Sequence, residues 1–233
     1  MTRHLVLLPG LDGTGQLFAD FIAALPNTFI AAVAAYPANR FLSYDELRLF
    51  VEAAVPKAEP FVLLAESFST PLALEYAASN PPNLAAVVIC AGFVLKPIGG
   101  WSRLLKAVAR PWLFRLKAPR CVLEHILVGR DASPTLIQKL RQVLRSVSPA
   151  VLSGRVQEAL DCDARNALAR ITVPLMYVLA AQDKLLAESC LPEMKRIKPE
   201  IVVSRIDGPH LLLQREAQNC ANIVSTFVQK IGG

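Results

Sequence analysis

The sequence lacks a hydrophobic run long enough to cross a membrane as a helix, although 53% of its 233 residues are hydrophobic. A membrane-spanning helix needs about 18 or more consecutive apolar residues. The longest candidates, such as NLAAVVICAGFVL at 83–95, have only the length of a buried strand with its flanks. The first residues, MTRHLVLLPGLDG, also lack the small-residue cleavage site of a secretory signal. We therefore expect neither a membrane span nor a signal peptide.

Metal-ligand clusters and paired cysteines are missing as well. The chain has only three histidines, and its five cysteines are odd in number, widely scattered and form no CxxC pair. Zinc motifs and disulfide frameworks both need such residues at close or regular spacing. The sequence therefore predicts no metal site, and free cysteines of this kind favour a reducing, cytoplasmic location.

Acidic residues are scarce in one part of the chain only. The net charge is +6, and the segment 96–158 contains twelve Lys or Arg against three acids, which gives 12 − 3 = +9. The remaining residues therefore carry 6 − 9 = −3. The basic character belongs to one segment, which points to a distinct surface rather than to the protein as a whole.

Short apolar runs that end in turn residues alternate with helical patterns. Runs that are apolar on both faces are typical of a parallel sheet covered by helices, and the alternation predicts an open α/β sheet with right-handed crossovers. The predicted strands are 5–10, 29–37, 61–67, 84–92, 174–183 and 200–208, and the predicted helices are 16–25, 44–55, 71–79, 188–197 and 215–231.

One long stretch breaks this alternation. Between Lys96 and about Arg170 the pattern is helical, is interrupted by prolines and contains no convincing strand. An insertion between two strands of an open α/β sheet usually lies over the strand ends, where such sheets bind ligands. We predict a single core formed by 1–95 and 171–233, with 96–170 inserted as a helical cap, or lid.

Ser67 lies where a buried strand passes directly into a helix, in Ala65-Glu66-Ser67-Phe68-Ser69. A nucleophile on such a turn has a strained backbone that tolerates only small side chains two residues away, hence the usual pattern G-x-S-x-G. Both glycines are replaced here, by alanine and serine, which are still small. A serine that caps the helix is the alternative, because serine often occupies that position.

The glycine-rich loop LLPGLDGTG at 7–15 follows the first predicted strand. Phosphate binding is a competing interpretation, but the loop matches neither G-x-G-x-x-G nor the GK[ST] ending of a P-loop. A backbone N–H of such a loop can instead stabilise developing negative charge on a substrate oxygen. Leu11 N–H, together with Phe68 N–H after the candidate nucleophile, is the predicted pair of donors.

His210 and Asp183 follow two later strands. Asp183 ends PLMYVLAAQD, and His210 lies in the turn DGPH, whereas His4 opens the first strand and His125 lies in the predicted cap. A lone loop histidine is often only a surface residue. However, Ser67, Asp183 and His210 all fall at carboxyl ends of predicted strands, in the order Ser, Asp, His that hydrolase sheets use.

Taken together, PGLDGTG, AESFS, TVPLMYVLAAQD and DGPHLLLQREAQ resemble the motifs of the α/β-hydrolase-fold serine hydrolases, a superfamily of esterases, lipases and acyltransferases. The resemblance covers essentially the whole chain and implies a mostly parallel sheet flanked by helices. It implies Ser67 as the nucleophile, His210 as the general base and then acid, and Asp183 as the residue that orients the imidazole. The missing elbow glycines and Pro9-Gly10 in place of His-Gly depart from the common pattern and blur the subfamily.

Other acidic residues compete for the orienting role. Asp12 is better placed to structure the glycine-rich loop, and Asp207 could cap the turn that carries His210. Asp161 and Asp163 precede a helix that they would begin. Glu66 is expected to hydrogen-bond locally and not to act as the base. Asp183 remains the preferred residue.

The resemblance implies cleavage of a carboxylic ester through an acyl-enzyme, with no cofactor. The alternatives are an acyltransferase with a non-water acceptor, since PGLDGTG and the ESF elbow are also similar to phytyl ester synthase and diacylglycerol acyltransferase-like proteins, and a non-catalytic ligand-binding protein of the same fold. The expected partner is a small-molecule ester or acyl substrate, not a nucleic acid.

The segment 99–120 is a basic amphipathic stretch. Trp101, Leu105 and Trp112 fall on its apolar side and are candidates to line the substrate pocket, while Arg103, Lys106 and Arg110 fall largely between apolar positions. The plainest interpretation is a lid with a solvated basic face. A basic segment with tryptophans is also typical of an anionic membrane interface or a surface for an acidic acyl carrier.

Overall fold

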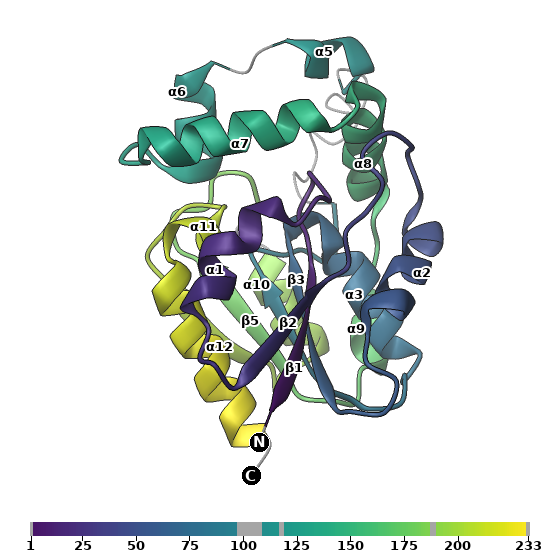
Figure 1. Cartoon of the computed structure of the whole chain (residues 1–233). Helices are drawn as coiled ribbons and strands as arrows, with labels where there is room; N and C mark the ends of the chain where they lie inside the picture. The colour runs from purple at the N-terminus through teal and green to yellow at the C-terminus, as the bar shows by residue number, and fades with distance from the viewer. Residues whose placement is uncertain (1, 97–108, 117–118, 187–189, 232–233) are drawn as a thin grey trace.

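The structure, a computed structural model, describes residues 2–96, 109–116, 119–186 and 190–231. In these ranges it contains one parallel sheet with the strand order β2-β1-β3-β4-β5-β6 (Figure 1). The strands are β1 (Arg3–Leu8), β2 (Phe29–Val33), β3 (Phe61–Glu66), β4 (Leu84–Cys90), β5 (Leu175–Ala180) and β6 (Val202–Ile206). The predicted open α/β sheet is confirmed. Strands β2 to β6 are shorter than the predicted ranges, whereas β1 begins two residues earlier and ends two residues earlier than predicted.

The central strands are buried on both faces, as their continuous apolar sequences require. Every residue of β3 is buried, and so are all but one of β4. In the register of the sheet Leu8 lies opposite Ala65, and Ala65 opposite Ile89. The carboxyl ends of β1, β3 and β4 therefore lie side by side, so the loops that follow these strands emerge at one edge.

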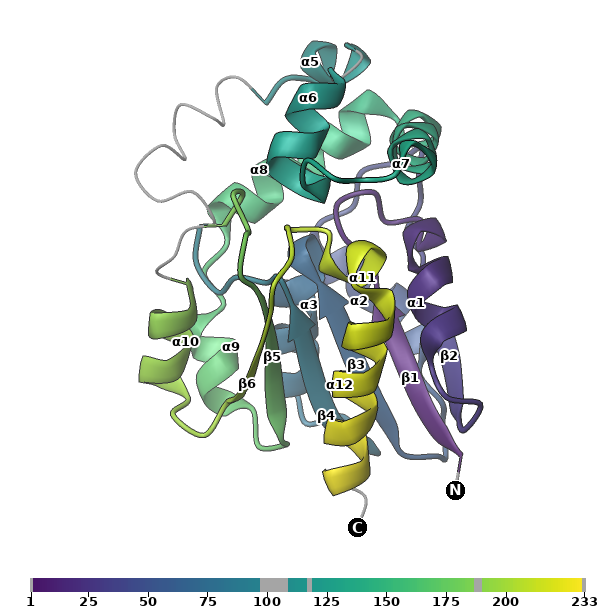
Figure 2. The same ribbon diagram turned by 90° about the vertical axis from the view of Figure 1, so that its left-hand side faces the viewer.

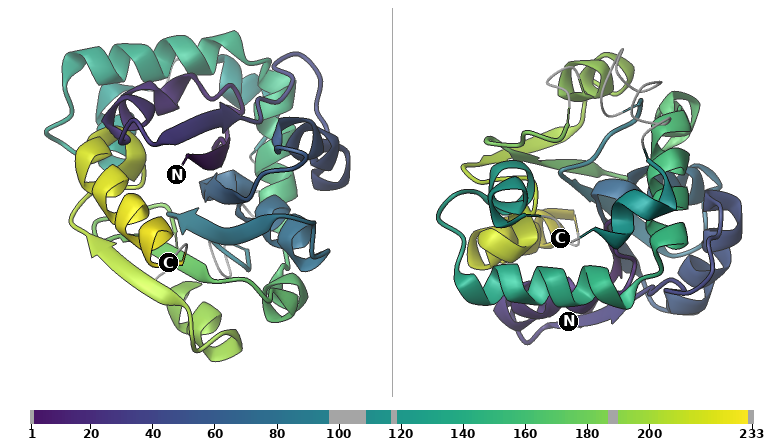
Figure 3. Two further views of the ribbon diagram at one scale, coloured as in Figure 1. Left: turned by 60° about the horizontal axis from the view of Figure 1, so that its bottom comes forward. Right: turned by 90° about the horizontal axis from the view of Figure 1, so that it is seen from above.

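Helices cover both faces of the sheet and create two hydrophobic clusters, one on each face (Figure 3). The helices on one face are α1 (Ala19–Ala24), α11 (Leu212–Arg215) and α12 (Ala217–Ile231), with the short turn η1 (Gln16–Phe18) leading into α1. Those on the other face are α2 (Tyr44–Ala54), α3 (Thr70–Ala78), α9 (Arg165–Arg170) and α10 (Cys190–Ile197).

Local sequence explains where several helices begin. Helix α2 begins after Ser43, whose side chain accepts from Glu46 N–H while the Glu46 carboxylate accepts from Ser43 N–H, a reciprocal capping box. Helix α7 (Pro134–Ser146) begins after Ser133, which accepts from Leu136 N–H, and has proline in its first turn. Proline is favoured there because the first helical N–H groups have no partner within the helix.

The remaining helices lie above the carboxyl ends of the strands (Figures 1 and 2). These cap helices are α5 (Pro111–Arg115), α6 (Arg120–Leu123) with the adjoining π-helix η4 (Glu124–Val128), α7 and α8 (Pro149–Asp161). Buried cap residues, among them Ile137 and Leu140, pack with Leu17 and Leu211 of the core. The cap thus shares a hydrophobic contact with the layer below it.

The predicted cap range 96–170 also includes α9, which lies beside the sheet. Ala167 and Leu168 of α9 are buried in the same cluster as residues of α3 and α10. Of the described part of that range, the helices that lie above the sheet end at Asp161. Within the described residues, no helix is both long and apolar enough to span a membrane.

Candidate active site

Ser67 lies at the turn between β3 and α3, in the short helical turn η2 (Ser67–Ser69). Its backbone φ is +48°, in the left-handed region that costs a non-glycine residue about 1–3 kcal/mol. Ala65 and Ser69, each two residues from Ser67 in the sequence, are completely buried. The small residues noted in the sequence therefore lie where a bulkier side chain would have no room, and Ser67 is presented on a sharp strand-to-helix turn.

Two other side chains meet Ser67 at this edge of the sheet. His210, from the loop between β6 and α11, places Nε2 at 2.8 Å from Ser67 Oγ. Its Nδ1 lies 2.7 Å from Oδ2 of Asp183, which follows β5. His210 is 2% exposed, so its ring is held in a packed environment. The structure brings together all three side chains that the sequence singled out.

The Asp183 carboxylate has hydrogen-bond partners on both oxygens. Oδ1 accepts from Leu185 N–H at 2.8 Å and from Leu186 N–H at 3.0 Å, and Oδ2 faces His210. Burial opposes ionisation of this carboxyl, but the hydrogen bonds from His210 and the two backbone groups outweigh it and hold its pKa below the usual value. Asp183 is therefore a charged, oriented partner for one ring nitrogen of His210.

The competing acids lie elsewhere or have other partners. Asp207 is exposed and accepts a hydrogen bond from Gln182 Nε2 at 2.9 Å. Asp12 accepts from the backbone and hydroxyl of Thr14, and Asp163 pairs with Arg165. Asp161 ends α8 in the cap. None of these carboxylates is hydrogen-bonded to His210.

The glycine-rich loop after β1 folds into a tight turn beside Ser67. Gly10 C=O accepts a hydrogen bond from Gly13 N–H at 3.0 Å. The peptide between Gly10 and Leu11 is trans, so Leu11 N–H points away from that carbonyl and out of the turn. Because β1 and β3 are neighbours, Leu11 N–H and Phe68 N–H belong to adjacent loops at the same edge.

A set of buried hydroxyls, which sequence reasoning missed, ties the turn at Ser67 to this loop. Ser69 Oγ donates to Pro9 C=O and is joined to Tyr36 OH at 2.7 Å. Tyr44 OH donates to Phe68 C=O at 2.8 Å, and the Tyr44 ring stacks on Phe68 with 5.0 Å between centroids. Serine in place of the second elbow glycine therefore supplies a hydrogen bond that glycine could not.

Arg155 is the other residue that the sequence analysis did not single out. It belongs to α8 of the cap but is 1% exposed, and its guanidinium donates to backbone carbonyls of the glycine-rich loop. A signal was available, because Arg155 follows Val151 by four residues and precedes Ala159 by four. All three therefore lie on one helix face, on which Val151 and Ala159 are buried.

Glu66, immediately before Ser67, points into the core and away from the triad. Burial, followed by the nearby charge of Asp12, raises the pKa of its carboxyl to about 8, against hydrogen bonds from Gln214 and the Gly10 backbone. Glu66 Oε2 lies 3.3 Å from Gln214 Nε2. Among the described residues no hydrogen bond joins Glu66 to Ser67 or His210, so Glu66 is not placed to act as the base.

The predicted pocket residues are only partly described. Trp101 and Leu105 lie outside the described residues. Trp112 is in α5 and is 57% exposed. Among the described residues, no group of three or more His, Cys, Asp or Glu side chains could hold a metal ion.

Comparison with solved structures identifies the fold. The chain is similar to the enol-lactonase from Burkholderia xenovorans LB400, with 16% identity and a TM-score of 0.80 over 98% of this chain and 92% of that one. A hydrolase from Oleispira antarctica is equally similar, with 16% identity and a TM-score of 0.80 over 98% of this chain and 92% of that one. A thermophilic esterase from Thermogutta terrifontis gives 15% identity and a TM-score of 0.76 over 99% and 91%.

No protein-family profile matches the sequence, and no curated protein is similar to it at a significant level. The similarity to solved structures is therefore one of fold. With its parallel sheet, flanking helices and strand order, the chain has the α/β-hydrolase fold.

Proposed function

We propose that the protein is a serine hydrolase that cleaves carboxylic esters through an acyl-enzyme. The observation that carries the proposal is the continuous chain of contacts from Ser67 Oγ to His210 Nε2 and from His210 Nδ1 to Asp183, at 2.8 and 2.7 Å. Nucleophile and base at hydrogen-bond distance, with the base oriented by a third group, are the requirements for activating a serine hydroxyl.

In the first half of the reaction His210 Nε2 accepts the Ser67 proton as Oγ forms a bond to the ester carbonyl carbon. The carbonyl oxygen becomes an oxyanion, for which Leu11 N–H and Phe68 N–H are the proposed donors. The bond from carbon to the alcohol oxygen then breaks, and His210 delivers the proton to the leaving alcohol. The negative charge of Asp183 stabilises the imidazolium between these two transfers.

In the second half a water molecule attacks the acyl-enzyme. His210 removes one proton from the water as its oxygen bonds to the carbonyl carbon, and the carbon–Oγ bond breaks. The proton returns to Ser67, and the carboxylic acid leaves. Water is consumed, and no electrons enter or leave, so this chemistry needs only the residues of the site.

An ester is favoured over an amide by two considerations. Leu11 of the proposed oxyanion loop packs against apolar cap residues, so the surroundings of that loop on the cap side are apolar, as the acyl part of an ester is. In addition, similar structures include proteins named as an esterase and an enol-lactonase, and a lactone is a cyclic ester.

The test is reaction of the whole protein with a fluorophosphonate probe and with p-nitrophenyl esters of increasing acyl length. We expect one modified residue, Ser67, identified by peptide mass spectrometry, and release of nitrophenol that the probe abolishes. Repeating the assay with an added primary alcohol distinguishes transfer from hydrolysis, since an acyltransferase would form the new ester instead of the free acid. A chain that neither reacts with the probe nor turns over any ester would be a binding protein, contrary to the proposal.

We also infer that the cap contacts an anionic membrane surface. Several apolar side chains in and next to α5 and α6 are exposed: Trp112 of α5 by 57%, Leu116 directly after α5 by 61% and Val122 of α6 by 42%. The exposed residues Arg110, Arg115 and Arg120 flank them. Arg103 and Lys106, which the sequence analysis placed in the same stretch, lie outside the described residues. Tryptophan and leucine between guanidinium groups suit the boundary between acyl chains and anionic headgroups.

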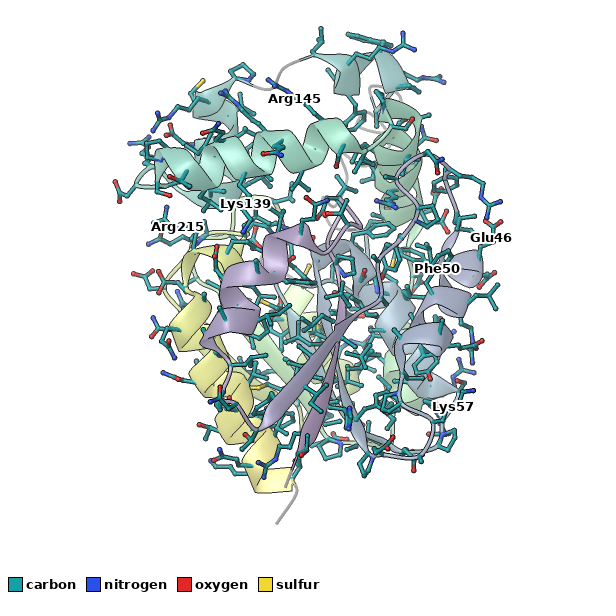
Figure 4. All side chains as sticks on the ribbon, in the orientation of Figure 1. Glu46, Phe50, Lys57, Lys139, Arg145 and Arg215 are labelled. Atoms are coloured by element: carbon teal, nitrogen blue, oxygen red, sulfur yellow. The ribbon has the colours of Figure 1, made fainter. Side chains whose placement is uncertain are left out.

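Wild-type protein should sediment with phosphatidylglycerol vesicles at low salt, but not with phosphatidylcholine vesicles or at high salt. Changing Arg110→Gln and Arg115→Gln together should weaken binding by about thirtyfold, given about 1 kcal/mol per basic residue. The control pair, Lys57→Gln with Lys230→Gln, removes the same charge at the opposite end of the molecule from the cap and should change little (Figure 4). If the wild-type chain ignores anionic vesicles, or binds only an acidic carrier protein, the membrane proposal is wrong.

A further inference from the structure

Arg155 connects the cap to the core through three backbone carbonyls, two in the glycine-rich loop and one, that of Pro37, in the segment after β2. Its Nη1 donates to Leu11 C=O at 2.9 Å and to Asp12 C=O at 2.6 Å, and Nη2 donates to Pro37 C=O at 3.0 Å. The guanidinium is planar and donates in fixed directions, so three carbonyls bound at once also fix the directions in which those carbonyls point. A buried charge of this kind is costly unless it is hydrogen-bonded, as this one is.

The bonds made by Arg155 continue the turn that presents Leu11 N–H. The peptide between Gly10 and Leu11 is held by the hydrogen bond from Gly13 N–H to Gly10 C=O. The next two peptides, whose carbonyls belong to Leu11 and Asp12, are held by Arg155. With Arg155 in place, three consecutive peptide planes are fixed, and Leu11 N–H has one direction.

The same guanidinium also contacts the second proposed oxyanion donor. It lies over the ring of Phe68, 6.0 Å from the centroid, and over that of Tyr36 at 5.6 Å. The carbonyl of Phe68 is held by Tyr44 OH. Arg155 is therefore in contact with both residues whose N–H groups are proposed to bind the oxyanion.

The loop itself is shaped around this side chain. A Cβ atom added at Gly13 would lie 2.4 Å from Arg155 Nη1, and Gly13 has φ of +69°. Burial raises the pKa of the Asp12 carboxyl, while hydrogen bonds from Thr14 and the charge of Arg155 act in the opposite direction. Space, backbone conformation and charge in the loop all match a guanidinium at this position.

We propose that Arg155 is a positioning residue of the oxyanion hole, through which the cap holds the glycine-rich loop in its reactive geometry. This inference rests on the proposed function of the site. Arg155 contacts no reacting atom; it acts through the peptide groups of Leu11 and Asp12 and through the ring of Phe68. The alternative is a purely structural role, in which Arg155 holds the cap on the core without affecting the oxyanion hole.

The test is Arg155→Met in the full-length protein, because methionine keeps an unbranched apolar stem and removes all three hydrogen bonds. We expect kcat for a short p-nitrophenyl ester to fall about 10- to 100-fold while KM changes less than about threefold, since the oxyanion forms only after substrate binds. A trifluoromethyl ketone, whose adduct with Ser67 carries a tetrahedral oxyanion, should bind more weakly by a similar factor. Arg155→Lys keeps the positive charge but not the planar guanidinium with its several donors, so kcat of this variant should also fall.

Two controls distinguish positioning from simple fastening. Arg145→Met makes the same change at an exposed position of the cap and should leave kcat and ketone affinity unchanged (Figure 4). Leu140→Ala removes a buried contact between cap and core, so it should lower the melting temperature without the selective loss of ketone affinity.

If Arg155→Met keeps kcat and ketone affinity within about twofold of wild type, or if Leu140→Ala reproduces its pattern, Arg155 is only a structural tie. An inactive, unlabelled wild-type chain would instead overturn the proposed function, so the two failures are distinguishable.

Discussion

Ser67→Ala and His210→Ala should each reduce kcat for p-nitrophenyl esters by roughly 10⁵- to 10⁶-fold, and the double variant should lose no more than either single one. The two side chains act as a unit, because the hydroxyl is a poor nucleophile without the ring and the ring has no substrate bond to make without the hydroxyl. Their 2.8 Å contact is the physical basis of this non-additivity. The activity is measured as nitrophenol release, and Ser67→Ala should also abolish labelling by the fluorophosphonate probe.

Folding must be shown to survive these changes. Alanine at position 67 can keep the backbone of the turn and removes only the hydrogen bond between Ser67 and His210. The melting temperature of Ser67→Ala should therefore remain close to that of wild type. His210 is buried, so His210→Gln serves as a second variant that fills more of the space. Ser79→Ala and His125→Ala are matched controls outside the site and should retain full activity. Near-normal turnover by folded Ser67→Ala would contradict the assignment of the nucleophile.

Much of the fold could be predicted because its signals are local. The run FVLLA at 61–65 is apolar at every position, which only a strand covered on both faces can use, and β3 is buried throughout. The turn residues that end each run mark the edge where loops emerge. A helical pattern predicts that a helix forms but not which part of the protein it packs against. Helix α9 is an example. Its sequence is adjacent to the cap, yet its apolar residues complete the layer beside the sheet.

The contacts around the site were less predictable because they join distant positions. Arg155 and Leu11 are separated by 144 residues, and Tyr36 and Ser69 by 33. Each appears in the sequence as an ordinary residue of its own segment, and only the packing of α8 over the glycine-rich loop gives Arg155 its partners. Ser69 is instructive in a different way. Its small size was recognised from the elbow pattern, whereas its hydroxyl, which binds the neighbouring loop, could not be inferred without the position of Pro9.

Asp183→Asn should reduce kcat by roughly 10⁴-fold, although it removes no atom that touches the substrate. The reason lies in the second oxygen of the carboxylate. Oδ1 accepts from Leu185 N–H and Leu186 N–H, so in the variant the amide oxygen must occupy that position and the NH₂ group must face His210. An NH₂ group donates to Nδ1, which places the ring proton on Nε2. In that tautomer Nε2 has no lone pair for the Ser67 proton, so the base is blocked.

Asp207→Asn is the matched comparison for this prediction. Asp207 is exposed, and its Oδ1 accepts from Gln182 Nε2, a bond that an asparagine oxygen can also accept. Activity of this variant should therefore stay within about twofold of wild type, since substitutions at exposed positions outside the core and the active site have small effects. Both variants are measured on the same ester, and their melting temperatures are compared to exclude unfolding. If Asp207→Asn were inactive and Asp183→Asn fully active, the orienting role would belong to Asp207, in the turn after β6. The His210 ring would then have to be oriented by a contact other than the 2.7 Å contact between Nδ1 and Asp183.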